Sequence, residues 1–273
     1  MAKPSSSLAL AGLSLVLLAR AAAAQSAEGA PAPVPSPRAA ALSAAEARAA
    51  EARAVAWYGT PYVAETEAPH GAGAVVDGVD LTPDGSRGVT RRFQLFDRLI
   101  LTAPVGRPGA VGDSLLLVRR GPALGTGQVL LPTGIAVVDG IAGSLRTARL
   151  VRVYDVVAAE QAVLPLPALP AVDSTVRSAG GRETSIVWID GGAELPSLQR
   201  VVVLAGGAAT SLREGDRLEV VGDGRRIAGG PVLPGTRAAV VRVVRVTAQG
   251  ASARIESQTQ PVVSIGMAAR TLP

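Results

Sequence analysis

One stretch of sequence occurs twice in this chain, and the repetition limits what the chain can fold into. Residues 111–119, which contain Gly112-Asp113, are closely similar to residues 214–221, which contain Gly215-Asp216. In both copies a short apolar run precedes the Gly-Asp pair at nearly equal spacing, and a valine-rich segment follows it. A duplication of this kind predicts two homologous domains within the 273 residues.

Each copy is expected to consist of short β-strands. Hydrophobic residues make up 48% of the chain and aromatic residues only 3%, so the core has to be aliphatic, and β-branched side chains pack well on a pleated sheet. The turn signals at 132–134 and 139–140 are predicted to separate strands. The predicted strands include 74–76, 92–102, 114–119, 127–131, 134–138, 148–153, 162–164, 185–190, 200–204, 239–246 and 253–256. We therefore expect a mainly β protein of two tandem, small, barrel-like or sandwich-like domains.

The N-terminal part has the composition of an exported protein. Residues 1–24 combine Lys3, an apolar run and small residues before Gln25, as in a secretory signal peptide, and the run is shorter than a membrane span. Residues 25–56 contain a Pro/Ala-rich stretch, expected to be a disordered tether, and then a helix at about 44–55.

The remaining domain limits follow from the strands and the prolines. A run with three closely spaced prolines cannot continue a strand ladder and marks a linker. We expect a first β-domain at 57–166, a linker at 167–181 and a second β-domain at 182–273.

Several chemistries are excluded by the residues that are missing. The chain has no cysteine and its only histidine is His70, so disulfides, thiol catalysis, zinc, haem and Ser-His nucleophiles are not expected. Asp77, Asp80 and Asp84 leave a calcium site open in principle, but they lack the acid ladder and terminal glutamate of an EF-hand. We expect no metal, no cofactor and no catalytic residue.

The repeated carboxylates have a structural interpretation. Asp113 and Asp216 each lack a second acid or a histidine at ligand spacing, and an aspartate in a turn usually bonds its own backbone. Gly112, Asp113, Gly215 and Asp216 are therefore predicted to be structural turn residues.

Trp57, Tyr58 and Tyr62 form the densest aromatic group in the chain. Aromatic rings beside Gly and Pro can form a surface for sugars or partner proteins, so these three residues are the candidate binding site. The alternative is that the rings cover the open end of the first β-domain, and the sequence leaves both readings open.

The formal charge of +5 comes almost entirely from arginine, since Lys3 is the only lysine. The candidate basic face consists of Arg119, Arg120, Arg225, Arg226, Arg242, Arg245 and Arg254. A nucleic-acid surface would interleave such residues with aromatic stacking platforms, which are missing, so no nucleic-acid partner is expected. An anionic polymer of the cell envelope fits the charge better.

Some of the repeated blocks resemble a known family. The segments concerned are 96–104, 111–120, 127–135, 197–204 and 214–216. They resemble the C-terminal region of exported bacterial LysM peptidoglycan-binding proteins, and the most specific piece runs from Val129 to Ile135. The resemblance implies an envelope location and a noncatalytic, cell-wall-associated role. The LysM motif itself is not seen upstream, so no glycan-binding residue is carried over. The Gly-Asp unit also resembles small β-domains of flagellar basal-body ring proteins.

The sequence therefore predicts an exported, noncatalytic binding or scaffolding protein of the periplasm or cell envelope, with no stable membrane span after processing. Peptidoglycan, another envelope polymer or envelope proteins are the expected partners. One alternative is a subunit of an envelope assembly. The other is a secreted hydrolase, which would require Asp113 to face Glu160, or Asp216 to face Glu256, across a cleft.

Overall fold

The computed structural model describes residues 37–65, 71–79, 92–106, 109–125, 127–171, 180–192, 198–222, 224, 230–231 and 235–272. The signal-like segment 1–24, the proline-rich stretch before residue 37, His70, Asp80, Asp84 and the pair Arg225-Arg226 lie outside the described residues. The chain divides into two compact units, Met1–Ala50 and Glu51–Pro273.

Helix α2 (Pro37–Gly59) is longer than the predicted helix at 44–55. Proline suits the first turn of a helix because it has no N–H to leave unpaired, and the alanines, glutamates and arginines that follow are strong helix formers. The helix ends at Gly59, where Thr60 Oγ1 donates to the free carbonyl of Ala56 at 2.6 Å. Trp57 and Tyr58 therefore belong to the last turn of the helix.

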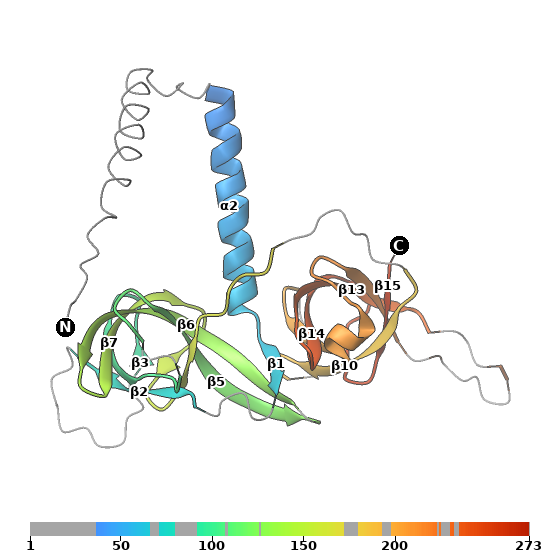
Figure 1. Ribbon diagram of the computed structural model, residues 1–273. Coiled ribbons are helices and arrows are strands. Elements are labelled where there is room, and N and C mark those ends of the chain that lie inside the picture. Colours follow the sequence, from blue (N-terminus) through green and yellow to red (C-terminus); the bar gives the residue numbers. More distant parts are fainter. Residues whose placement is uncertain are drawn as a thin grey trace, which may run out of the picture. The chain divides into compact units, whose positions relative to one another are not determined.

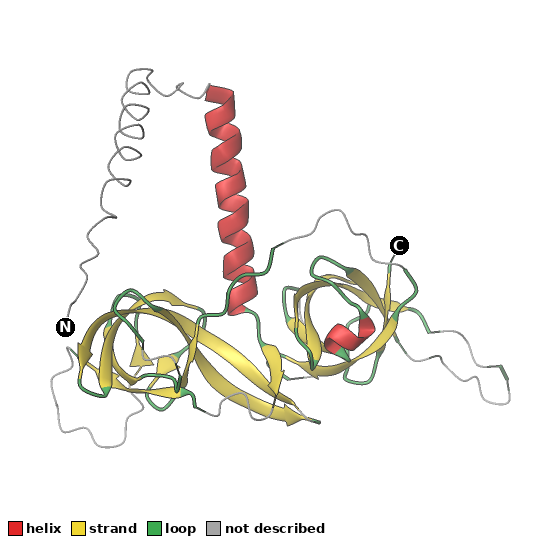
Figure 2. Cartoon of the chain, viewed as in Figure 1, coloured by secondary structure: helices red, strands yellow, loops and turns green. Residues whose placement is uncertain are grey.

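Strands dominate the rest of the described chain, as Figure 2 shows in yellow. Those before the linker are β1 (Tyr62–Glu65), β2 (Gly73–Gly78), β3 (Arg92–Phe93), β4 (Arg98–Thr102), β5 (Ser114–Leu124), β6 (Gly127–Ala142), β7 (Leu145–Val153), β8 (Val157–Ala158) and β9 (Ala162–Pro165). Those after it are β10 (Glu183–Ile189), β11 (Val201–Ala205), β12 (Arg217–Val221), β13 (Arg237–Val246), β14 (Gly250–Gln258) and β15 (Ala268–Thr271), with the 3-10 turn η1 (Gly207–Thr210).

The two copies form antiparallel barrels, which Figure 1 shows mainly in green and in orange to red. Both barrels are closed and have the same strand order. Around the first barrel the order is β2-β4-β7-β6-β5-β9, and around the second it is β10-β11-β14-β13-β12-β15. Matching the strands in chain order makes the two lists identical. The predicted pair of homologous β-domains is confirmed.

The irregularities of pairing recur as well. Four register shifts of the first barrel have a counterpart in the second, on the matching strands. They lie at Val75/Asp77 and Ile186/Trp188, at Leu117/Val118 and Val220/Val221, at Ile135/Ala136 and Val240/Val241, and at Val138/Gly140 and Val243/Arg245. Bulges bend and twist strands at set places, so their recurrence shows that the copies share backbone detail as well as strand order.

Strand β6 corrects two of the predicted turns. The signals at 132–134 and 139–140 lie inside this one continuous strand, because Pro132 sits beside the register shift at Val118 and Gly140 sits at another shift opposite Thr147. Proline and glycine occur at bulges for the same reasons that they occur in turns. The predicted strand 92–102 is also divided, because Phe96 takes a positive φ of 74° between β3 and β4.

Each barrel has its own aliphatic core. Leu99, Leu101, Leu117 and Leu150 are fully buried in the first barrel. The matching interior of the second barrel is lined by residues such as Val202, Leu218 and Ile255. Among the described residues, we find no helix with the length and apolar character to cross a bilayer.

Candidate functional site

The predicted aromatic site surrounds a buried arginine. Arg245 lies on β13 at a register shift, so its side chain leaves the barrel wall while its neighbour Val246 packs against the barrel core. The guanidinium carbon lies 4.0 Å from the centre of a Trp57 ring and 3.4 Å from the centre of the Tyr62 ring. A cation against two ring faces that exclude water forms a strong cation–π contact.

Glu214 fixes the end of helix α2 at the same place. Its carboxylate accepts hydrogen bonds from Trp57 Nε1 at 2.6 Å and from Arg53 Nη2 at 2.7 Å. Arg53 also donates to the Pro170 carbonyl, at 2.7 Å, and the Tyr58 hydroxyl donates to the Pro167 carbonyl at 2.9 Å. The last turns of α2 are thus bonded both to the linker and to the loop before β12.

Electrostatics at this cluster follow from burial. Desolvation lowers the pKa of Arg245, and the nearby Tyr62 and Glu214 partly oppose that shift. Desolvation likewise raises the pKa of Tyr62, with Arg245 acting in the opposite direction. The arginine stays charged, and Arg245 Nη1 is buried without a hydrogen-bond partner among the described residues.

An apolar seam continues from this cluster. The buried side chains of Val63, Val129 and Leu131 pack with Val203 of β11, and Trp188 packs against them. Thr247 Oγ1 donates to the Val63 carbonyl at 2.7 Å. We call this cluster and seam together the junction, because residues from both barrels, β1 and α2 meet there.

The structure places the three candidate aromatics within the junction. Trp57 is 6% exposed and Tyr62 is 7% exposed, and Tyr58 is half-buried. Tyr62 and Arg245 line a hollow of about 560 Å³ together with residues 164–168, which run from the end of β9 into the linker. Tyr58 lines a separate hollow of about 310 Å³. Binding by these rings therefore stays a prediction.

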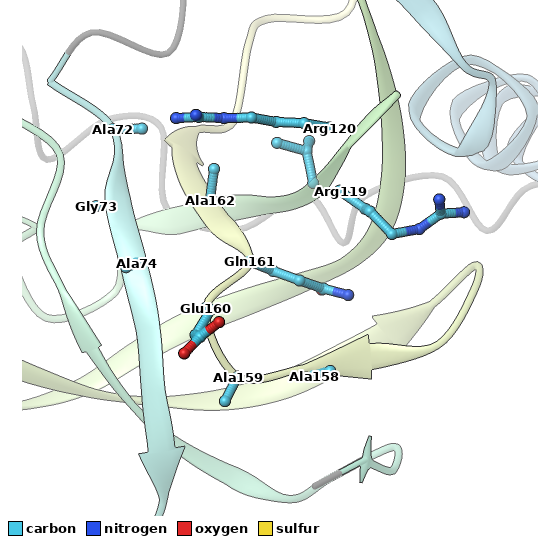
Figure 3. A pocket seen from close by; sticks show the side chains of 11 residues that line it. Ala72, Gly73, Ala74, Arg119, Arg120, Ala158, Ala159, Glu160, Gln161 and Ala162 are labelled. Carbon is cyan, nitrogen blue, oxygen red and sulfur yellow. The ribbon is translucent and has the colours of Figure 1, made fainter. Parts of the chain in front are cut away.

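A second hollow, of about 490 Å³, lies on the first barrel (Figure 3). It lies where the pairing of β5 with β9 ends, after Val118 and Ala162. Small residues such as Ala72 and Ala74 line it. Figure 3 shows Arg120 reaching across the hollow toward Ala72, while the carboxylate of Glu160 lies beyond Gln161.

Some polar side chains of this second hollow form hydrogen bonds or ion pairs within the protein, and others do not. Gln161 donates to the Val156 carbonyl at 2.8 Å and accepts from Thr133 at 2.7 Å, and Arg119 pairs with Asp155 at 3.3 Å. Within the part of the chain that the structure describes, the side chains of Arg120 and Glu160 have no hydrogen-bond or ion-pair partner. Among the described lining residues there is no serine, cysteine or histidine that would act as a nucleophile or its base.

Both repeated aspartates bond their own turns. Asp113 Oδ2 accepts from the Ala110 N–H at 2.8 Å, and Asp216 Oδ2 accepts from the Arg213 N–H at 2.9 Å. The preceding glycines have φ values of 94° and 91°. Gly112 N–H donates to the Val138 carbonyl of β6, and Gly215 N–H donates to the Val243 carbonyl of β13, both at 2.8 Å. The two turns are the same structure.

The acids that a hydrolase would require lie in different surroundings. Asp113 lines a hollow with Tyr58 and Pro165, whereas Glu160 lines the hollow of Figure 3. Glu256 is bonded to Arg217 and Arg242 rather than to Asp216. Among the described residues, no three acidic or histidine side chains gather as metal ligands would.

The predicted basic face is divided by the structure. Arg242 is exposed on β13, whereas Arg245, three residues further on, is buried in the junction. Arg53 and Glu214, which hold the junction together, were not among the predicted site residues. Arg53 is one of several arginines in a helical segment, and Glu214 stands in the repeated segment 214–221, where the pattern points to Gly215 and Asp216. Arg245 could have been singled out by aligning the two copies. Its equivalent in the first barrel is Gly140, so the arginine is specific to the second copy.

Comparison with known proteins adds no family. No protein-family model matches this chain, and no curated protein matches it either.

Proposed function

We propose that this protein is an exported, noncatalytic binding or scaffolding protein of the cell envelope, with peptidoglycan as its partner. The observation that carries the proposal is the junction. A buried cation, a shared carboxylate and an apolar seam hold α2, the linker and both barrels together. A module of this construction is suited to hold a rigid surface at the end of the N-terminal segment, which has the composition of a signal and tether.

The carboxylates support the noncatalytic part of the proposal. Three of the four acids that a glycan hydrolase would use are engaged: Asp113 and Asp216 bond their own turns, and Glu256 forms ion pairs with arginine. A catalytic acid needs a raised pKa and a partner carboxylate across a cleft. The hydrogen bonds that Asp113, Asp216 and Glu256 accept give each of them a structural role.

The test is retention of the full chain on purified peptidoglycan sacculi. The mature chain is incubated with sacculi at low ionic strength, sedimented and quantified, and the measurement is repeated with added salt. We expect retention at low salt that weakens as salt is added, because exposed arginines attract an anionic polymer through a screened interaction. Absence of the chain from the pellet at low salt would refute the proposal.

A second candidate is a subunit of an envelope assembly, which one surface feature favours. Phe96 is 64% exposed, and its backbone N–H donates to the Leu150 carbonyl of the first barrel. Val153 and Val156 of the same barrel are also exposed, at 42% and 45%. Light scattering on the mature chain distinguishes the two: a discrete oligomer supports the assembly, and a monomer excludes it.

A further inference from the structure

Three arginines lie side by side on the outer wall of the second barrel. Arg217 of β12 is paired in register with Arg242 of β13, and Arg242 with Arg254 of β14. Residues directly opposite one another project from the same face of a sheet. The side chains of Arg217 and Arg242 are 52% and 50% exposed. We call Arg217, Arg242 and Arg254 the arginine rung.

One carboxylate is bonded to the rung. Glu256 accepts from Arg217 Nε at 2.9 Å through one oxygen and from Arg242 Nε through the other. Arg254 Nε is buried without a hydrogen-bond partner among the described residues. The structure thus shows which group suits this surface, a carboxylate held between guanidinium groups, and it leaves positive charge in excess.

The cross-strand partner of the next acid along β12 lies outside the rung. Glu219, the next outward residue on β12, lies opposite Arg270, and Arg270 forms an ion pair with Glu183 at 2.6 Å. Like charges placed directly opposite one another across strands repel, and Glu256 offsets that repulsion only for Arg217 and Arg242.

The first barrel shows that the fold does not require the rung. Its equivalent positions, fixed by the same strand pairing, carry Ser114, Val137 and Arg149, and Val151 stands in the place of Glu256. The same barrel therefore forms with a single arginine in these places. The arginines that are specific to the second barrel therefore have a role other than forming the fold.

We propose that the arginine rung binds carboxylate groups carried by an anionic polymer, and that Glu256 occupies one of the places that such a carboxylate takes. This inference rests on the proposed function and names the chemistry of its partner. Guanidinium groups bind carboxylates through paired hydrogen bonds. Several weak contacts to one polymer add up, because after the first contact the others form at high local concentration.

The experiment uses fluorescently labelled poly-L-glutamate and the full chain, with binding followed by anisotropy at low ionic strength. The variant R217S/R242V carries the residues that the first copy has at the same positions, so the barrel is expected to fold, as circular dichroism verifies. Its affinity should fall about tenfold, the equivalent of ~1.4 kcal/mol. The matched control R149S/R152S removes the same charge from the first barrel and should bind like the parent chain.

A second variant keeps the inference testable if the first one folds poorly. E256Q removes the internal carboxylate but keeps its shape, so the polymer no longer competes with it and should bind several-fold tighter. Equal loss in R217S/R242V and R149S/R152S, or no gain in E256Q, would overturn the inference. Tighter binding of polyphosphate than of poly-L-glutamate would overturn the assignment to carboxylates. Retention on sacculi by R217S/R242V at the level of the parent chain would leave the proposed function standing and remove the rung from it.

Discussion

Arg245 shows what a single residue adds to a duplicated fold. At this position the first barrel has Gly140, and in both copies a register shift turns the residue away from the barrel core. The second barrel uses that outward position to place a guanidinium between Trp57 and Tyr62. The arginine is therefore a residue of the junction and contributes nothing to the interior of its own barrel.

Replacement of Arg245 tests that assignment. R245A removes two cation–π contacts and leaves a cavity, so the free energy of unfolding should fall by about 2 kcal/mol. R245M keeps the volume and removes the unpartnered donor, so it should lose less. Urea unfolding followed by tryptophan emission measures both, and the emission of R245A should shift to longer wavelength as Trp57 meets water. R149A, on the exposed face of the first barrel, serves as the control; equal stability of R245A and R149A would contradict the assignment.

Asp139 gives the first barrel a dependence on pH. Hydrogen bonds from Arg98 and Thr147 hold the pKa of this carboxyl below its ordinary value of 3.8. Because the folded pKa is the lower one, its stabilising contribution is complete above the unfolded pKa and is lost as the pH falls through the folded pKa. D139N should therefore lose stability at neutral pH and show a smaller further loss on acidification than the parent chain. Thermal unfolding measured from pH 7 down to about 3 would show it; parallel profiles for the two chains would contradict it.

At the scale of elements, the two Gly-Asp turns offer a matched pair. A Cβ added at Gly112 or at Gly215 would meet no atom within 4 Å, so only the backbone conformation opposes a side chain there. With φ values of 94° and 91°, G112A and G215A should each cost about 1–2 kcal/mol. Thermal unfolding of the two variants should show losses of similar size. A loss in one variant alone would mean that the turns differ in a way that their shared hydrogen bonds do not reveal.

How far the sequence predicts these elements depends on how local their causes are. The Gly-Asp turns and the valine-rich strands were predictable because a few consecutive residues determine them. The break predicted at Pro132 was wrong because proline marks a bulge as readily as a turn, and only the partner strand decides between them. Strand β1 was missed because its four residues form a strand only by pairing with β6. The hydrogen bond from Trp57 to Glu214 joins residues that are 157 positions apart in the sequence, and no local pattern predicts such a contact.

At the scale of the whole molecule, the junction decides whether the two barrels unfold together. Each barrel has a complete core, so each is expected to fold without the other. Val203 is fully buried and belongs to the apolar seam rather than to the core of its barrel. Strand pairing gives it a counterpart in the first barrel, Ile100, which has the same outward position on β4 but lies outside the seam.

The two positions therefore allow coupling to be separated from stability. V203D places a carboxylate in an apolar contact, where an unpaired charge costs several kcal/mol, so the seam should open and let water reach it. We expect one calorimetric transition for the parent chain and two for V203D, since the barrel cores are unchanged. I100D should keep the single transition, because its carboxylate stays at the surface. Two transitions in the parent chain, or one transition at a lower temperature in V203D, would mean that the seam does not couple the barrels.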